Sequence, residues 1–365
     1  MAYTVSGTTV IDNSRQLTNI TSVNVDGLND SVSGTSFLNR TNRIINGDMR
    51  IDQRHNGAIV TAGSGNIYSL DRWYMIYSVD GKYTIQQQQN PSGIPFGTVA
   101  QITSTSAYTV GTSQIFAVRQ AIEGLNIADL KWGTSSASPV TISFWVNSTI
   151  AGTFGGSVMN SASNMSYPFS YSISTANTWQ YVTITVTGPT SGTWLTNQNA
   201  GAWLVFGLGG GSTYSGTAGA WVTSAKFTAN GAVSLVGTSG ATMYLTGVQF
   251  EKGSVATPFE YRIYGQEFAL CQRYFFNLTG IVGRIDTTTS NVIFATPLNM
   301  RSSPTVTFAS TQQIHEMSIA TRDISSIVTN SLSYNGGYVR FSMTTSGGSG
   351  NLCNINGNVF ADAEI

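Results

Sequence analysis

Several aromatic and amide side chains stand where the sequence predicts the outer face of a β-strand. Three segments alternate apolar with polar or aromatic residues at a period of two, and successive side chains of a strand point to opposite faces. We expect the apolar half of each segment to face a core. The outward positions are Trp145 and Asn147 in residues 140–147, Trp179 and Tyr181 in residues 179–186, and Trp203 in residues 202–208.

Outward aromatic rings beside amides and hydroxyls are suited to binding sugars. The ring faces stack on the CH groups of a sugar, while the polar groups form hydrogen bonds with its hydroxyls. Trp145, Trp203, Trp179, Tyr181 and Asn147 are therefore the candidate ligand-binding residues. The alternative is that these rings pack against a neighbouring subunit or a second sheet.

Paired carboxylates are the candidate for catalysis, because a glycosidase needs two acids about 5–10 Å apart. Five acids come into question, four close together near the start of the chain and one much later: Asp48, Asp52, Asp71, Asp80 and Glu251. The alternative is that Asp71 pairs with a neighbouring arginine and the others cap turns. We favour this alternative, so the sequence indicates a protein that binds and is not an enzyme.

Other catalytic motifs are missing from the sequence. His55 and His315 lie far apart, and neither has the neighbours that a serine triad or a metal site requires. The glycine-rich run 207–216 lacks the lysine of a phosphate-binding loop, and we expect a flexible loop there.

The elements that would position the candidate residues are β-strands. Short alternating segments separated by Gly, Ser and Asn turns predict an all-β fold, with a two-sheet sandwich over residues 42–262. In residues 242–250 the alternation places Tyr244, Val248 and Phe250 on one face.

The period changes after the sandwich. Phe268, Cys271, Gln272 and Phe275 recur at helical spacing and predict a bridging helix within residues 263–276. Alternating segments then resume in residues 277–365, where we expect a small C-terminal β-domain of sandwich type.

Composition excludes several classes of function. Only 9% of the 365 residues are charged, and 17 Lys and Arg balance 17 Asp and Glu, so there is no basic surface for nucleic acid. No apolar run is long enough for a membrane span, and the first residues lack the pattern of a signal peptide. Cys271 and Cys353 are too far apart for a metal motif, and we expect both to be reduced.

Residues 1–41 differ from the remainder of the chain. They contain short β-prone runs with too little apolar surface for a core of their own. Such a segment becomes stable when identical chains bury it against each other, so we expect a homotrimer held together here. The alternative is an unstructured leader.

Three stretches carry a resemblance to a known class of proteins. Residues 245–275 (LTGVQFEKGSVATPFEYRIYGQEFALCQRYF) closely resemble a segment of tail-fibre and receptor-binding proteins of tailed bacteriophages. Residues 42–51 (NRIINGDMRI) with 71–74 (DRWY) are similar to the opening of the same domain, and residues 297–306 (PLNMRSSPTV) to the C-terminal domain.

The resemblance implies a jelly-roll sandwich similar to carbohydrate-binding modules, within a virion fibre made in the host cytoplasm. It implies attachment to other virion proteins through residues 1–41 and contact with a host-surface glycan. In similar jelly rolls the first and last strands often meet at a structural Ca²⁺, which makes Asp48 and Glu251 candidate metal ligands. A capsid-decorating head fibre and a cell-envelope glycan hydrolase remain the alternatives.

Overall fold

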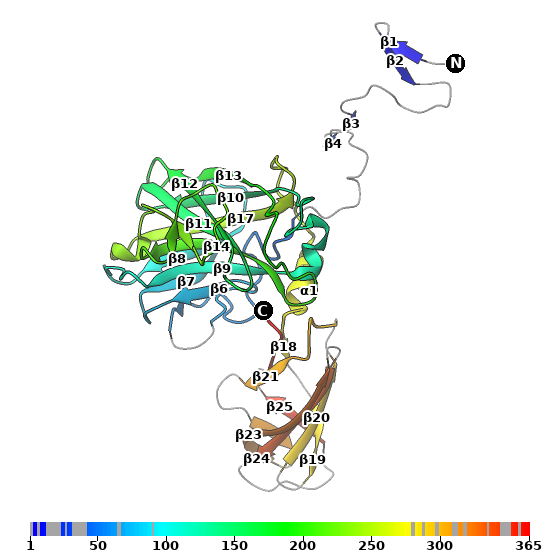
Figure 1. The fold of residues 1–365 in the computed structure, drawn as a ribbon. Helices are drawn as coiled ribbons and strands as arrows, with labels where there is room; N and C mark the ends of the chain where they lie inside the picture. The colour runs from blue at the N-terminus through cyan, green and yellow to red at the C-terminus, as the bar shows by residue number, and fades with distance from the viewer. Residues whose placement is uncertain are drawn as a thin grey trace. The chain divides into compact units, whose positions relative to one another are not determined.

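The computed structural model describes residues 3–5, 8–11, 23–25, 28–30, 42–63, 67–89, 91–278, 282–286, 289–295, 299–308, 313–316, 320–333, 336–343, 352–356 and 359–365. The chain divides into two compact units, residues 1–41 and residues 42–365. Figure 1 shows strands in both units, and the prediction of an all-β fold is confirmed.

The first unit contains two short antiparallel pairs of strands. β1 (Tyr3–Val5) pairs with β2 (Thr8–Ile11), and β3 (Val23–Val25) pairs with β4 (Leu28–Asp30). β2 and β3 lie within the runs that the sequence marks as β-prone. The prediction that these runs join three chains stays a prediction.

Two antiparallel sheets form the sandwich in the second unit. Sheet I has the order β13-β10-β17-β8-β7-β5, and sheet II has the order β12-β11-β14-β9-β6. Sheet I consists of β5 (Val60–Thr61), β7 (Tyr83–Gln89), β8 (Thr98–Ser104), β10 (Val140–Ser148), β13 (Gln180–Val186) and β17 (Thr242–Lys252). Sheet II consists of β6 (Tyr74–Tyr77), β9 (Ile115–Glu123), β11 (Gly152–Asn160), β12 (Ser166–Ile173) and β14 (Ala200–Gly210).

The chain crosses between the sheets repeatedly, from β8 to β9, β9 to β10, β10 to β11, β12 to β13 and β13 to β14. This alternation between two antiparallel sheets is the jelly-roll arrangement. Short elements connect the strands: β15 (Ser215–Gly216), β16 (Thr228–Ala229) and three 3₁₀ turns at Gly124–Asn126, Ala128–Leu130 and Leu235–Gly237.

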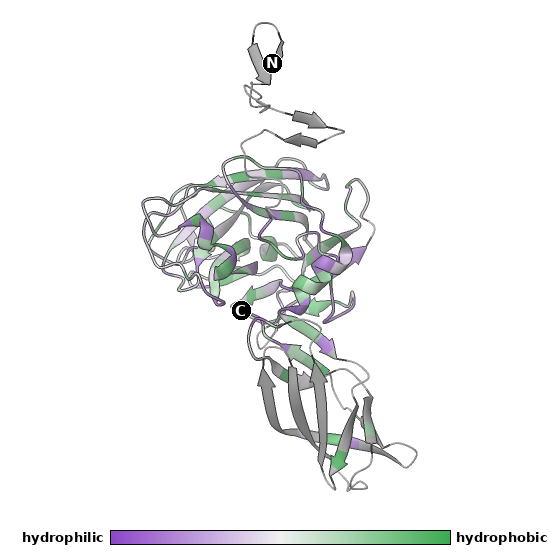
Figure 2. Cartoon of the chain, turned by 90° about the vertical axis from the view of Figure 1, so that its right-hand side faces the viewer, coloured by the Kyte–Doolittle hydropathy of each residue, from purple (hydrophilic) through white to green (hydrophobic). Residues whose placement is uncertain are grey.

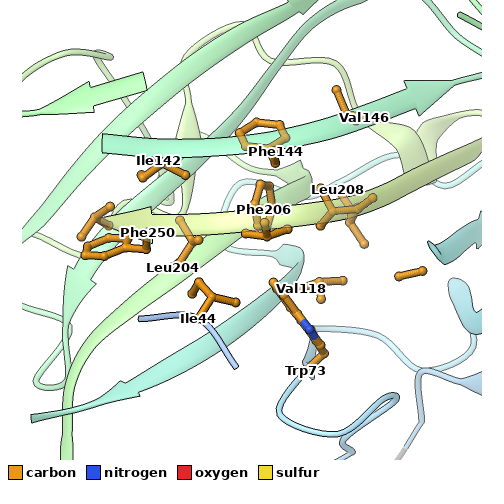
Figure 3. Packing of buried hydrophobic residues seen from close by; sticks show 14 of the residues in the cluster. Ile44, Trp73, Val118, Ile142, Phe144, Val146, Leu204, Phe206, Leu208 and Phe250 are labelled. Carbon is orange, nitrogen blue, oxygen red and sulfur yellow. The ribbon is translucent and has the colours of Figure 1, made fainter. Parts of the chain in front are cut away.

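The hydrophobic core lies between the two sheets (Figure 3). Phe144 of β10 meets Phe206 of β14 edge to face, with ring centroids 5.0 Å apart, and the Trp73 ring lies 6.2 Å from Phe206 on the other side. Hydrophobic and hydrophilic residues interleave along the strands in Figure 2, as expected for strands with one buried face. The predicted inward positions of three strands are buried in this core or packed against it: Ile142, Phe144, Val146, Val182, Ile184, Val186, Leu204, Phe206 and Leu208.

Strand β17 departs from the predicted alternation. Val248 and Phe250 are buried in the core, whereas Tyr244 faces outward, so the prediction that these three share a face is wrong. The pairing of β17 with β10 shifts register between Ser143 and Trp145, and Gly247 has a φ of +60°. A bulge at a glycine inserts one residue and reverses the faces beyond it.

The glycine-rich run also differs from the expected flexible loop. Residues 207–210 belong to β14, and only the following turn leaves the sheet. The glycines allow residues 211–230 to lie directly on β14, because a Cβ at Gly207 would be 2.7 Å from Oγ1 of Thr228.

Helix α1 (Tyr264–Gln272) follows the sandwich and confirms the predicted helix. Cys271 and Gln272 are buried, and Phe275 already belongs to β18 (Phe275–Leu278). The Cys271 thiol packs against Ile45, Ile51 and Tyr274, and burial raises its pKa. Cys353 is buried as well.

The C-terminal residues form a closed barrel and a small sheet, where the sequence predicted a sandwich. The barrel order is β19-β20-β24-β23-β22-β25, and the sheet order is β18-β26-β21. Alternation within single strands cannot distinguish these arrangements, because both bury one face of each strand. The bounds are β19 (Val282–Asp286), β20 (Thr289–Ala295), β21 (Thr305–Phe308), β22 (Gln313–Glu316), β23 (Ala320–Ser333), β24 (Gly336–Met343), β25 (Leu352–Asn356) and β26 (Val359–Asp362).

Candidate functional site

A groove of about 590 Å³ lies on the outer face of sheet I. Its lining comes from three strands and two loops: Gln88, Asn147 and Tyr244 from β7, β10 and β17, Pro91, Ser92 and Gly93 before β8, and Asn177, Thr178 and Trp179 before β13. Segments far apart in the sequence therefore meet in one surface hollow.

Strand register brings the groove residues together. Asn147 of β10 pairs with Tyr244 of β17, and Tyr244 pairs in turn with Gln101 of β8. Since Val146 and Met243 point into the core, their neighbours Asn147 and Tyr244 point outward.

The Trp179 ring is fixed at the edge of the groove by the loop before β8. Its Nε1 donates a hydrogen bond of 3.0 Å to the carbonyl oxygen of Ser92. A Cβ on Gly93 would lie 3.6 Å from the indole Cδ1, so the ring packs against the loop. The Trp179 and Tyr244 ring centroids are 6.2 Å apart at an angle of 57°, and the two rings therefore form one aromatic wall.

A second aromatic pair lies on the same outer face. Trp145 pairs with Tyr181 across β10 and β13, and their ring centroids are 5.3 Å apart. Tyr181 is 45% exposed, while Trp145 is half-buried. Trp145 stands two residues before Asn147 on β10, so this pair extends the aromatic surface along the sheet beyond the groove.

None of the described residues that line the groove carries a carboxylate, imidazole, guanidinium or ammonium group. It offers aromatic faces, amides and hydroxyls, which suit an uncharged polyhydroxyl ligand. Oδ1 of Asn147 is buried without a hydrogen-bond partner. The chemistry that this lining can perform is stacking and hydrogen bonding.

The structure brings four of the five predicted binding residues to one face and separates the fifth. Trp145, Asn147, Trp179 and Tyr181 lie on the outer face of sheet I, whereas Trp203 of β14 lies on the outer face of sheet II.

The sequence analysis missed Tyr244 as a groove residue, because an unbroken alternation of β17 placed it on the same face as core residues. The bulge at Gly247 is the feature that turns Tyr244 outward.

The two predicted metal ligands have protein partners. Oδ2 of Asp48 lies 3.1 Å from Nε of Arg50, and burial raises the Asp48 pKa. The Glu251 carboxylate accepts hydrogen bonds from Gln249 and from the backbone N and Oγ1 of Thr257. Among the residues that the structure describes, no three or more His, Cys, Asp or Glu side chains gather in a metal-binding arrangement.

Asp71 and Asp52, two of the acids considered for catalysis, are engaged in structural contacts, whereas Asp80 is exposed. Asp71 is buried and accepts two hydrogen bonds from Gln53, at 2.6 and 2.7 Å, while Asp52 caps a turn through the backbone N of His55 and Gly57. Burial raises the pKa of Asp71 to about 6. These contacts agree with a turn-capping role for Asp52, whereas the main partner of Asp71 is a glutamine instead of the expected arginine.

No family model and no curated protein matches the sequence. Solved structures resemble parts of the chain at low identity. The enzymatically active domain of tailspike protein 4 from bacteriophage CBA120 is 12% identical, with a TM-score of 0.30, and the match covers 58% of this chain and 21% of that one. The chain thus spans about a fifth of the tailspike.

Two further structures show a similar level of likeness. A protein from Bacteroides thetaiotaomicron described as a putative sugar binding protein is 13% identical over 58% of this chain and 99% of that one, with a TM-score of 0.34. The CBM22-1 xylan-binding domain from Paenibacillus barcinonensis is 11% identical over 55% of this chain and 97% of that one, with a TM-score of 0.26. These values are too low to assign a family.

Proposed function

We propose that this chain is a structural fibre protein of a tailed bacteriophage whose sandwich binds a neutral glycan of the host surface. Glycan binding is supported by the uncharged groove on sheet I, where the Trp179 and Tyr244 rings lie beside the Asn147 and Gln88 amides. Stacking on a sugar face with hydrogen bonding to its hydroxyls uses all of these groups together.

Binding without hydrolysis is the better match to the groove. Both retaining and inverting glycosidases use two carboxyl groups at the scissile bond. The described residues of the groove lining supply none, and Asp71 and Glu251, two of the acids considered for catalysis, are occupied by hydrogen bonds elsewhere. Release of reducing sugar from host envelope by the purified protein would favour the hydrolase alternative.

The fibre part of the proposal is supported by sequence resemblance and by the short strand pairs of residues 1–41. These strands would attach the fibre to other virion proteins and hold three chains together. Three tethered sandwiches raise the effective concentration of each groove, so weak single-site binding suffices to retain a particle on a cell.

Two experiments test the proposal. Gold-labelled antibody against this chain should mark the tail of the virion, whereas label on the capsid would favour the head-fibre alternative.

The purified protein should bind host envelopes and lose that binding after periodate oxidation, which cleaves the vicinal diols of sugars. Equal binding to oxidised envelopes would contradict the glycan as ligand.

A further inference from the structure

An arginine lies between two aromatic rings on the outer face of sheet II. Arg119 of β9 pairs with Tyr74 of β6 on one side and with Val205 of β14 on the other. Its Cζ lies 3.8 Å from the ring centroid of Trp203 and 4.6 Å from that of Tyr74. Three neighbouring strands therefore place a cation over two rings.

Arg119 differs from the other buried or half-buried arginines of the sandwich in having no anionic partner. Arg43, Arg50, Arg54, Arg72 and Arg262 each form an ion pair. Within the described part of the chain, the Arg119 side chain makes neither an ion pair nor a hydrogen bond, and its Nε is buried without an acceptor. Nε1 of the adjacent Trp203 is also a buried donor without an acceptor.

The two rings contact only part of the Arg119 guanidinium. The aromatic contacts are made through the faces of the guanidinium, since rings attract a cation over the plane. The N–H groups point outward in that plane, where they can hold both oxygens of a carboxylate or phosphate at once. Among the described residues the terminal nitrogens of Arg119 have no hydrogen-bond partner, and neither belongs to the fully buried atoms without a partner, so both keep some exposed surface.

We propose that Arg119, Trp203 and Tyr74 form a second binding site that takes an anionic group of the surface polymer, a carboxylate or a phosphate. Arg119 holds the two oxygens, and Trp203 stacks on the guanidinium and fixes its plane. This site lies on the sheet opposite the neutral groove, and its preference for an anion does not depend on that groove; that the anion belongs to a host-surface polymer rests on the proposed function.

As the ligand of Arg119, an anionic group on a carbohydrate is favoured over an acidic side chain from a second copy of the chain. Only 17 acidic residues occur in the sequence. Most of those described in the sandwich are already in ion pairs or hydrogen bonds: Asp48, Asp52, Asp71, Glu123, Asp129, Glu251, Glu260 and Glu267. A second copy therefore has few acids left to offer Arg119.

The test measures binding of three probes to the full chain: oligogalacturonate, poly(glycerol phosphate) and a neutral galacto-oligosaccharide. The unaltered protein should bind at least one anionic probe, and Arg119→Gln should raise its Kd by about tenfold or more, because a bidentate charged contact is lost. Arg119→Lys keeps the charge without the planar fork and should fall between the two. Preference for oligogalacturonate assigns a carboxylate, and preference for poly(glycerol phosphate) assigns a phosphate.

Lys82→Gln is the matched control, because Lys82 also lies over an aromatic ring, with Nζ 4.8 Å from the Tyr108 centroid. It removes the same charge and should leave the Kd for the anionic probe unchanged. The proposal would be overturned if the unaltered protein bound neither anionic probe, or if Arg119→Gln bound the probe as tightly as the unaltered protein. A change in oligomeric mass of Arg119→Gln on light scattering would also overturn it, by assigning Arg119 to a contact between subunits.

Discussion

Individual side chains of the sandwich are held by neighbours from distant parts of the sequence. The Trp179 indole is bonded to the loop before β8, and the Asp71 carboxylate to Gln53. In both cases a hydrogen bond with the backbone of another segment holds the side chain. Such contacts decide which groups are available to a ligand.

The buried Asp71 carboxyl gives a test at the residue scale. Burial raises its pKa from 3.8 to about 6, so the folded state binds this proton more tightly than the unfolded state. The contribution of Asp71 to stability is therefore complete at low pH and is lost as the pH rises from about 4 to about 6.

Asp71→Asn removes the titrating group. Urea unfolding across this range should show the stability of the unaltered protein falling relative to Asp71→Asn, by up to about 1.4 kcal/mol per pH unit. Parallel pH profiles for the two proteins would mean that the carboxyl does not titrate as burial requires.

At the scale of elements, the bulge in β17 decides which face the site occupies. Gly247 has a φ of +60°, and a Cβ there would lie 2.6 Å from the Phe96 ring. Gly247→Ala meets both backbone strain and a clash, and we expect a loss of about 2–4 kcal/mol in the free energy of unfolding.

Gly240→Ala is the control for this change. Gly240 also has a positive φ, of +73°, but nothing lies within 4 Å of its added Cβ. It should cost about 1 kcal/mol through strain alone. Equal losses for the two variants, measured by chemical unfolding, would contradict the close packing of Phe96 on the bulge.

The bulge also shows where prediction from the sequence alone fails. Alternation predicted the inward residues of β10, β13 and β14 correctly, because those strands keep a strict period of two against the core. It failed in β17, where one glycine in an unusual conformation shifts the period. The gathering of Trp145, Trp179 and Tyr181 could be expected from outward positions, whereas the separation of Trp203 depends on sheet order, which single-strand patterns do not contain.

For the whole molecule, the last described residues are joined to the opening of the sandwich by buried charges. The Glu364 carboxylate pairs with Arg72 and with Arg54, and both Glu364 and Arg72 are almost fully buried. Glu364→Gln leaves Arg72 buried without its anion and should lower the free energy of unfolding by about 3–5 kcal/mol.

Asp129→Asn is the matched control for this pair. Its partners are Arg43 and Lys252, but the Asp129 side chain is 52% exposed, so the change should cost about 1 kcal/mol or less. If Glu364→Gln were no more destabilising than Asp129→Asn, the buried pair would not contribute to joining these segments.

The proposed fibre also has an expected assembly. Light scattering of the intact chain should give three times the monomer mass, since the short strands of residues 1–41 need partners to bury their apolar side chains. Removal of residues 1–41 should lower the mass to that of one chain. A monomer mass for the intact chain would contradict the proposed trimer.

The most direct test of the central claim is the Kd of a neutral oligosaccharide from the host envelope, measured by titration calorimetry. Tyr244→Ala should weaken binding by about tenfold or more, because it removes one ring of the aromatic wall. Tyr214→Ala is the matched control: Tyr214 is also half-buried in an aromatic pair, 5.4 Å from Phe227, but over sheet II. We expect an unchanged Kd for Tyr214→Ala. Equal Kd values for Tyr244→Ala and the unaltered protein would contradict the groove on sheet I as the glycan site.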